Sequence, residues 1–213
     1  MKSLQSEHAA EICKGYDAPQ TVLDALAALG EDASPRALID ALTGENLHGD
    51  AATFLAHGMP PREGVWWACQ VADYVKDTYK PLDLSDLIDA AKTWVRTPTD
   101  ETRRTAMAKA EAADFENPAS WAAAAAFWSE GSLAEPDMPE VPPPPGLYRT
   151  AIAAAITMAA VTPDQGAHAS AHYQHFLTIG IDIADGGNGQ TSSQGQEARQ
   201  TASPPDPLTP ANR

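Results

Sequence analysis

Proline and glycine interrupt this chain at intervals of about ten to eighteen residues, and alanine is abundant between them. Runs of β-branched residues, which favour strands, are absent. Alanine is the strongest helix former, while proline and glycine mark helix starts and ends. The segments DAPQTVLDALAALG and SPRALIDALTG follow this pattern, each with a capping residue in front (Asp17, Ser34) and a glycine at its end. The pattern predicts an all-α protein, a single-domain bundle of about eight helices.

The composition divides the 213 residues into five parts. A chain of this length suits one domain with appendages. The stretch LAEPDMPEVPPPPG is acidic and proline-rich, which is typical of an extended connection. Beyond it the final segment has almost no large apolar residue, so burial cannot offset the entropy of ordering it. We predict a flexible N-terminus (1–15), a helical bundle (16–132), an acidic proline-rich connection (133–146), C-terminal helices packed on the bundle (147–184) and a disordered tail (185–213).

The formal net charge of −15 restricts the class of partner. Between residues 110 and 212 only Arg149 and Arg199 are basic, against twelve acidic residues. This field repels nucleic-acid phosphates and anionic lipid, so we expect a protein partner with basic character, no nucleic acid and no membrane. No run reaches the roughly 18 apolar residues of a spanning helix. The two cysteines form no CxxC pair, and the start has no apolar signal core, which predicts a cytoplasmic protein.

The stretch MPPREGVWWACQVADYV, residues 59–75, is predicted to be one helix with two different faces. At 100° per residue, its apolar arc holds the predicted core residues Val65, Trp67, Ala68, Cys69, Val71, Ala72 and Val75. Trp66 falls in the opposite sector, among Glu63, Gln70 and Asp73. Either another segment covers Trp66, or Trp66 is an exposed anchor, because tryptophan is enriched at interaction hot spots. These four residues are the partner-binding candidates.

Motifs that would support catalysis are scarce. There is no GxSxG, P-loop or Rossmann fingerprint, and GGNGQ at 186–190 lacks the strand and lysine of a phosphate loop. The apolar neighbours of Cys69 predict a buried, inert thiol. His168, His172 and His175 share one face of a predicted helix, either as its polar face or as metal ligands, although the outer two lie about 10 Å apart along the axis. We expect no catalytic residue, cofactor or metal, and therefore no enzyme.

Two segments resemble the signatures of an uncharacterised bacterial family of small all-helical proteins. They are FLAHGMPPREGVWWACQVADYV, with its twin tryptophans, and HYQHFLTIGIDIADG, and the similarity spans about residues 16–186. The family has no established catalytic residues, and the three histidines lie outside its pattern. The resemblance implies an association with type VI secretion components, and so an adaptor or chaperone-like accessory that acts by protein docking.

Three other functions remain open at this stage. An immunity protein could neutralise an effector through its acidic surface. A metal-dependent enzyme could use the face of His168, His172 and His175. A structural scaffold could assemble with further copies of itself.

Overall fold

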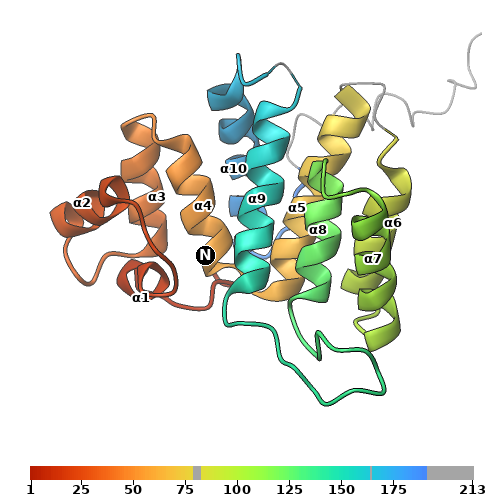
Figure 1. Ribbon diagram of the computed structural model, residues 1–213. Helices are drawn as coiled ribbons and strands as arrows, with labels where there is room; N and C mark the ends of the chain where they lie inside the picture. Colours follow the sequence, from red (N-terminus) through yellow and green to blue (C-terminus); the bar gives the residue numbers. More distant parts are fainter. Residues whose placement is uncertain (79–82, 164, 191–213) are drawn as a thin grey trace, which may run out of the picture.

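The computed structural model describes residues 1–78, 83–163 and 165–190, which form ten helices and no strand (Figure 1). The predicted all-α, single-domain bundle is confirmed, with more helices than the expected eight. The helices are α1 (Ala9–Cys13), α2 (Gln20–Leu29), α3 (Pro35–Gly44), α4 (His48–Gly58), α5 (Pro61–Thr78), α6 (Ser85–Arg96), α7 (Asp100–Ala112), α8 (Pro118–Phe127), α9 (Leu147–Val161) and α10 (Ala169–Ala184).

The bundle is built around α5 and α9. Helix α9 packs against α4 and α8, while α5 packs against α6, α8, α9 and α10 (Figure 1). Helices α2 and α3 lie at one end of this arrangement, and α6 and α7 lie at the other. The C-terminal helices thus pack on the bundle of their own chain. Among the described residues, no helix has both the length and the apolar character needed to cross a bilayer.

The two helix caps that were predicted from the sequence have different outcomes. The predicted cap of α3 is confirmed, since the Ser34 hydroxyl accepts a hydrogen bond from the Ala37 amide at 3.2 Å and Pro35 is the first helical residue. The predicted cap of α2, Asp17, is wrong, because this helix begins at Gln20 after Pro19. A residue that precedes proline is disfavoured in helical conformation, so Ala18 is a poor first helical residue and Asp17 is a poor cap.

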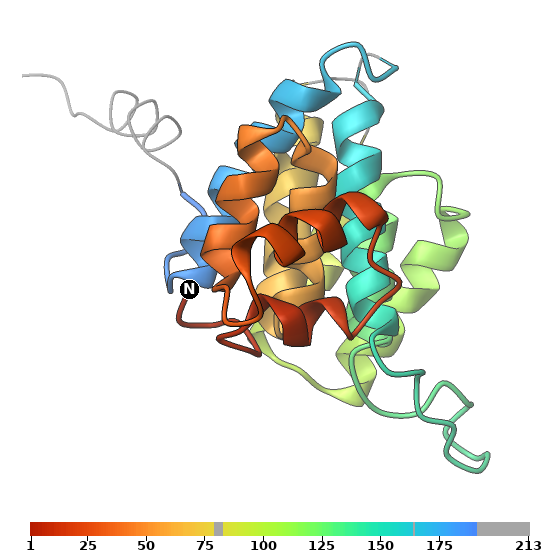
Figure 2. The same cartoon turned by 90° about the vertical axis from the view of Figure 1, so that its left-hand side faces the viewer.

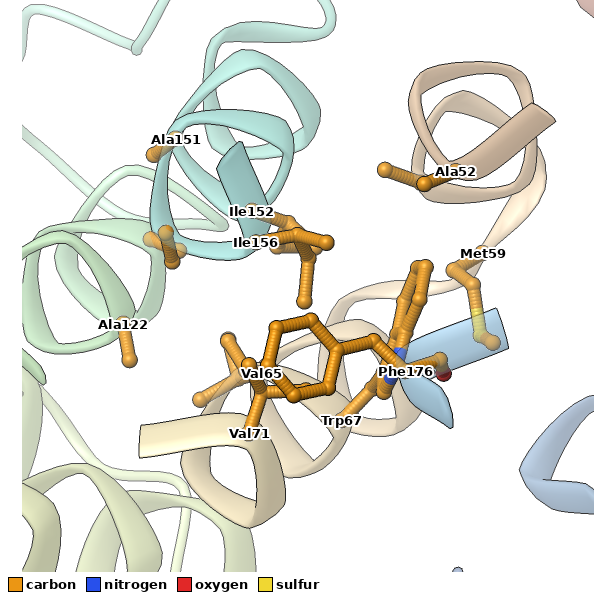
Figure 3. Packing of buried hydrophobic residues seen from close by; sticks show 14 of the residues in the cluster. Ala52, Met59, Val65, Trp67, Val71, Ala122, Ala151, Ile152, Ile156 and Phe176 are labelled. Atoms are coloured by element: carbon orange, nitrogen blue, oxygen red, sulfur yellow. Dashed lines mark hydrogen bonds between the residues drawn. The ribbon is translucent and has the colours of Figure 1, made fainter. Parts of the chain in front are cut away.

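The predicted core face of α5 is confirmed, because all seven of its residues are fully buried. Trp67 lies among Ile152, Ile156 and Phe176 (Figure 3), and its indole N–H donates to the Phe176 carbonyl at 2.8 Å. A Cβ atom at Gly180 would lie 2.6 Å from Cε2 of Trp67. Glycine at this position therefore allows α10 to approach α5 closely, and the Trp67 ring fills the space.

The acidic connection is exposed but anchored at its start. The Arg103 guanidinium, on α7, donates to the carbonyls of Phe127 and Ser132 at 3.2 and 2.7 Å and pairs with Asp100. Only 1 % of Arg103 is exposed, although α7 is rich in charged residues. Hydrogen bonds from Val141 to Ser132 Oγ and from Leu133 to the Val141 carbonyl close the loop beyond.

The N-terminus that was predicted to be flexible is packed instead. Helix α1 buries Ala9, Ile12 and Cys13, and the amides of Ser3 and Gln5 donate to the carbonyls of Ala184 and Gly58, each at 3.0 Å. Three apolar residues in a five-residue helix are a weak sequence signal, so the sequence does not predict this contact.

The boundary predicted for the disordered tail, residue 185, lies too early in the chain. Residues 185–190 turn back on α10, with the amides of Gly187 and Gly189 donating to the carbonyl and carboxylate of Asp182, both at 2.8 Å. Gly186 and Gly189 have φ values of +96° and +80°, which glycine adopts without strain. The remainder of the predicted tail, 191–213, lies outside the described residues.

Candidate functional site

Trp66 lies half-buried in a cleft of about 300 Å³. The cleft forms where the start of α5 meets α6, the N-terminal segment and the end of α10. Its lining residues are Ser3, Arg62, Glu63, Trp66, Val95, Ile183, Gly186 and Gly187. Of the four predicted partner-binding residues, Trp66 and Glu63 line this cleft, whereas Gln70 and Asp73 are not among its lining residues.

The segment that follows α10 partly covers Trp66. The indole N–H of Trp66 donates to the main-chain carbonyl of Asn188 at 2.9 Å. Of the two interpretations of Trp66, the structure thus supports a covering segment, and this segment belongs to the stretch that was predicted to be disordered tail. The glycines of GGNGQ were the sequence signal for this turn, because Gly186 and Gly189 adopt positive φ values.

The charges beside Trp66 are paired within the chain. Asp73 pairs with Lys92 and, at 3.1 Å, with Lys76, and hydrogen bonding to Asp73 raises the pKa of Lys76. The Lys92 ammonium also lies 5.8 Å from the ring centroid of Trp66, within the range of a cation–π contact. The Arg62 guanidinium donates twice to the Val95 carbonyl, at 3.0 and 2.8 Å. Asp73 therefore contributes little free negative charge, and Glu63 is the acidic residue that lines the cleft.

The three histidines do not share one helical face. His168 is exposed and precedes the first residue of α10, so the predicted spacing fails at its first member. His172 is buried and donates from Nδ1 to the Ala160 carbonyl at 2.9 Å. The His175 ring lies 4.7 Å from that of Tyr74, and burial lowers the pKa of His175. The described part of the chain holds no cluster of three residues suited to a metal ion.

A serine–histidine contact that sequence reasoning missed joins α4 to α10. The buried His48 places Nδ1 at 3.1 Å from Ser170 Oγ and Nε2 at 2.9 Å from Gln174 Nε2. In a hydrolase a carboxylate would orient the imidazole and stabilise its charged form. In this protein the side-chain amide of Gln174 occupies the position of that carboxylate. We interpret the contact as a pair of hydrogen bonds that hold α4 and α10 together. His48 and Ser170 lie 122 positions apart, so no local sequence pattern predicts their contact.

The two thiols are buried. Cys69 is fully buried, and burial raises its pKa to about 12, so the thiolate needed for nucleophilic attack is not formed near neutral pH. Burial also raises the pKa of Cys13. The predicted burial of Cys69 is confirmed.

The burial of His57 predicts that the fold loses stability in mild acid. Its ring stacks on Tyr16 with centroids 4.0 Å apart, and burial, aided by the positive charge of Arg149, lowers its pKa to about 4. An unfolded histidine titrates near 6.5, so below that pH the unfolded chain binds a proton that the folded chain does not. The contribution of His57 to the free energy of unfolding is therefore at its maximum above about pH 6.5, and it declines as the pH falls towards 4.

We expect wild-type protein to lose about 2 kcal/mol more of its free energy of unfolding between about pH 7.5 and 5 than His57→Phe, which keeps a stacked ring. Urea unfolding of both proteins at both pH values measures this difference. An equal loss in the two proteins would show that His57 does not contribute to the acid sensitivity.

Comparison with known proteins places the fold and the cleft in a family. A family model described as a family of unknown function (DUF6931) matches residues 38–184. The chain belongs to this family. The DUF6931 match covers most of α3, all of α4 to α10 and most of the cleft. It begins later than the resemblance at 16–186 and brings no link to secretion. Searches of curated proteins and of solved structures found no match.

Proposed function

We propose that this chain is a non-catalytic, cytoplasmic protein-binding module, an adaptor or chaperone-like accessory of a bacterial secretion machine. The observation that carries the proposal is the half-buried Trp66, whose indole N–H is bonded to a main-chain carbonyl in a cleft. Tryptophans of this kind supply a large apolar contact and one directed donor to a partner. The sequence resemblance makes the type VI system the first candidate machine.

The way Trp66 is covered suits exchange with a partner segment. The Asn188 carbonyl reaches the indole from an exposed segment after the end of α10, and any extended peptide offers the same acceptor. Within the cleft, Val95 and Ile183 supply apolar contacts and Glu63 supplies a negative charge. The net charge of −15 would steer a basic partner towards the molecule.

Affinity purification of the tagged full-length protein from its native host tests the proposal. We expect a secretion component to be recovered with the wild type and to decrease at least about tenfold with Trp66→Ala. Trp121→Ala is the matched control, because Trp121 is also half-buried and donates its indole N–H to a main-chain carbonyl, that of Phe115, at 2.9 Å. This variant is expected to retain the partner.

Two results would contradict the proposal: recovery of no secretion component from cells that express the machine, or equal recovery with Trp66→Ala. Relief of a neighbouring gene product's toxicity by co-expression would instead indicate an immunity protein.

A further inference from the structure

Helix α2 leaves most of its apolar side chains uncovered. Val22, Leu26 and Leu29 form a helical stripe in the sequence, but the fold buries only Val22 completely. Leu26 is half-buried and Leu29 is 42 % exposed, and the neighbouring Leu23 is exposed as well. Helices α1 and α2 lie on the side of the molecule that faces the viewer in Figure 2.

A groove of about 940 Å³ runs between α1, α2 and the segment that joins them. Helix α2 lines it with Leu23, Leu26 and Ala27, which at spacings of i, i+3 and i+4 share one face of the helix, and Gly30 lines it just after the helix ends. The buried Cys13 lines the α1 side. This volume lies towards the upper end of the range of binding pockets, about 300–1,000 Å³.

The lining of the groove is acidic as well as apolar. It includes four carboxylates, those of Glu11, Asp17, Glu31 and Asp32. Lys14 is the one lysine of the lining, and its ammonium lies 2.7 Å from the Glu11 carboxylate. Three carboxylates therefore remain uncompensated by a lysine of the groove.

A buried polar group of the groove also lacks a partner. The hydroxyl of Tyr16, which lines the groove, is buried and has no hydrogen-bond partner among the described residues. Leaving a buried hydroxyl unsatisfied costs about 1–3 kcal/mol.

We propose that the groove between α1 and α2 binds a basic amphipathic helix of a partner protein. An apolar face with leucine-like side chains would pack on Leu23, Leu26 and Ala27, while flanking lysine or arginine side chains would pair with Glu31 and Asp32. The ten residues of α2 span about 15 Å, which matches a partner helix of about three turns.

Other occupants fit the groove less well. A second copy of a chain with net charge −15 would be repelled by the acidic rim. The sequence of residues 191–213 has two arginines against two acidic residues, and Leu208 is its one large apolar residue. A basic apolar segment from another protein remains the best complement.

This site is separate from the Trp66 cleft and from the family match. All its lining residues lie between positions 8 and 32, before the match begins at residue 38. The inference therefore does not depend on the proposed role of Trp66, and Trp66→Ala is expected to leave binding in the groove unchanged.

Fluorescence anisotropy with the full-length protein and synthetic peptides tests the inference. The probe is a labelled peptide of about 14 residues with leucine at i, i+3, i+4 and i+7 and lysine at flanking positions. A scrambled peptide of the same composition removes the helical periodicity. Two groove variants, Leu23→Asp and the double substitution Glu31→Lys with Asp32→Lys, are compared with Asp24→Lys, an exposed position of α2 outside the lining.

We expect the periodic peptide to bind with a micromolar Kd, at least about tenfold more tightly than the scrambled peptide. Both groove variants should weaken binding at least about tenfold, and Asp24→Lys by less than about twofold. Circular dichroism confirms that each variant is folded. Equal binding of both peptides, no binding up to about 1 mM, or full binding by folded groove variants would each overturn the inference.

Discussion

Replacing Trp67 by alanine is expected to lower the free energy of unfolding by about 3–5 kcal/mol. The side chain is fully buried between α5 and α10, and its removal leaves a cavity and removes the hydrogen bond to the Phe176 carbonyl. Urea denaturation followed by far-UV circular dichroism measures the change. If Trp67→Ala does not fold at all, Trp67→Phe, which keeps most of the apolar volume, provides a smaller and measurable loss.

The neighbouring tryptophan supplies the matched control. Trp66→Ala removes a half-buried ring and one hydrogen bond, that to Asn188, so we expect a loss of about 1 kcal/mol. Similar losses for the two substitutions would show that Trp66 is as much a part of the core as Trp67. A small loss for Trp66→Ala also makes its partner-binding test interpretable, because the variant stays folded.

Replacing Arg103 by methionine is expected to lower the free energy of unfolding by about 2–4 kcal/mol. Methionine keeps much of the aliphatic volume but loses the donors to Phe127 and Ser132, the ion pair with Asp100 and the contact of the guanidinium with the Phe127 ring, 4.7 Å away. The start of the acidic connection then loses its attachment to α7. Thermal or urea unfolding measures the loss, and limited proteolysis tests whether the connection becomes more accessible.

Arg104 is the control for this prediction. It contacts the same Asp100 and donates to the Ala134 carbonyl at 2.8 Å, but about a quarter of its side chain is exposed. Water can replace its hydrogen bonds, so we expect Arg104→Met to cost about 1 kcal/mol or less. Equal losses for Arg103→Met and Arg104→Met would contradict the role assigned to the buried guanidinium.

The contact of Trp67 with α10 also positions the candidate site. The hydrogen bond to Phe176 and the close approach at Gly180 hold α10 against α5. The segment that covers Trp66 follows directly from the end of α10. Loss of Trp67 packing is therefore expected to disturb the cleft as well as the core.

The proposed sites differed in how far the sequence could predict them. The helical wheel of residues 59–75 correctly placed Trp67 in the core and Trp66 on the other face, because both positions follow from a rotation of 100° per residue. The same method placed three histidines on one face and failed, because His168 lies before the start of α10. Periodicity is informative only inside a helix whose ends are known.

The sequence by itself determined the all-α class, most of the helices and the apolar face of α5, since these depend on residues a few positions apart. Only the tertiary structure decided which polar or exposed faces are covered. Trp66 meets Asn188 across 122 residues, and Arg103 is buried by Phe127 and Ser132. The uncovered face of α2 was equally unpredictable. Local rules set the conformation of a helix, but its burial depends on which distant segments pack against it.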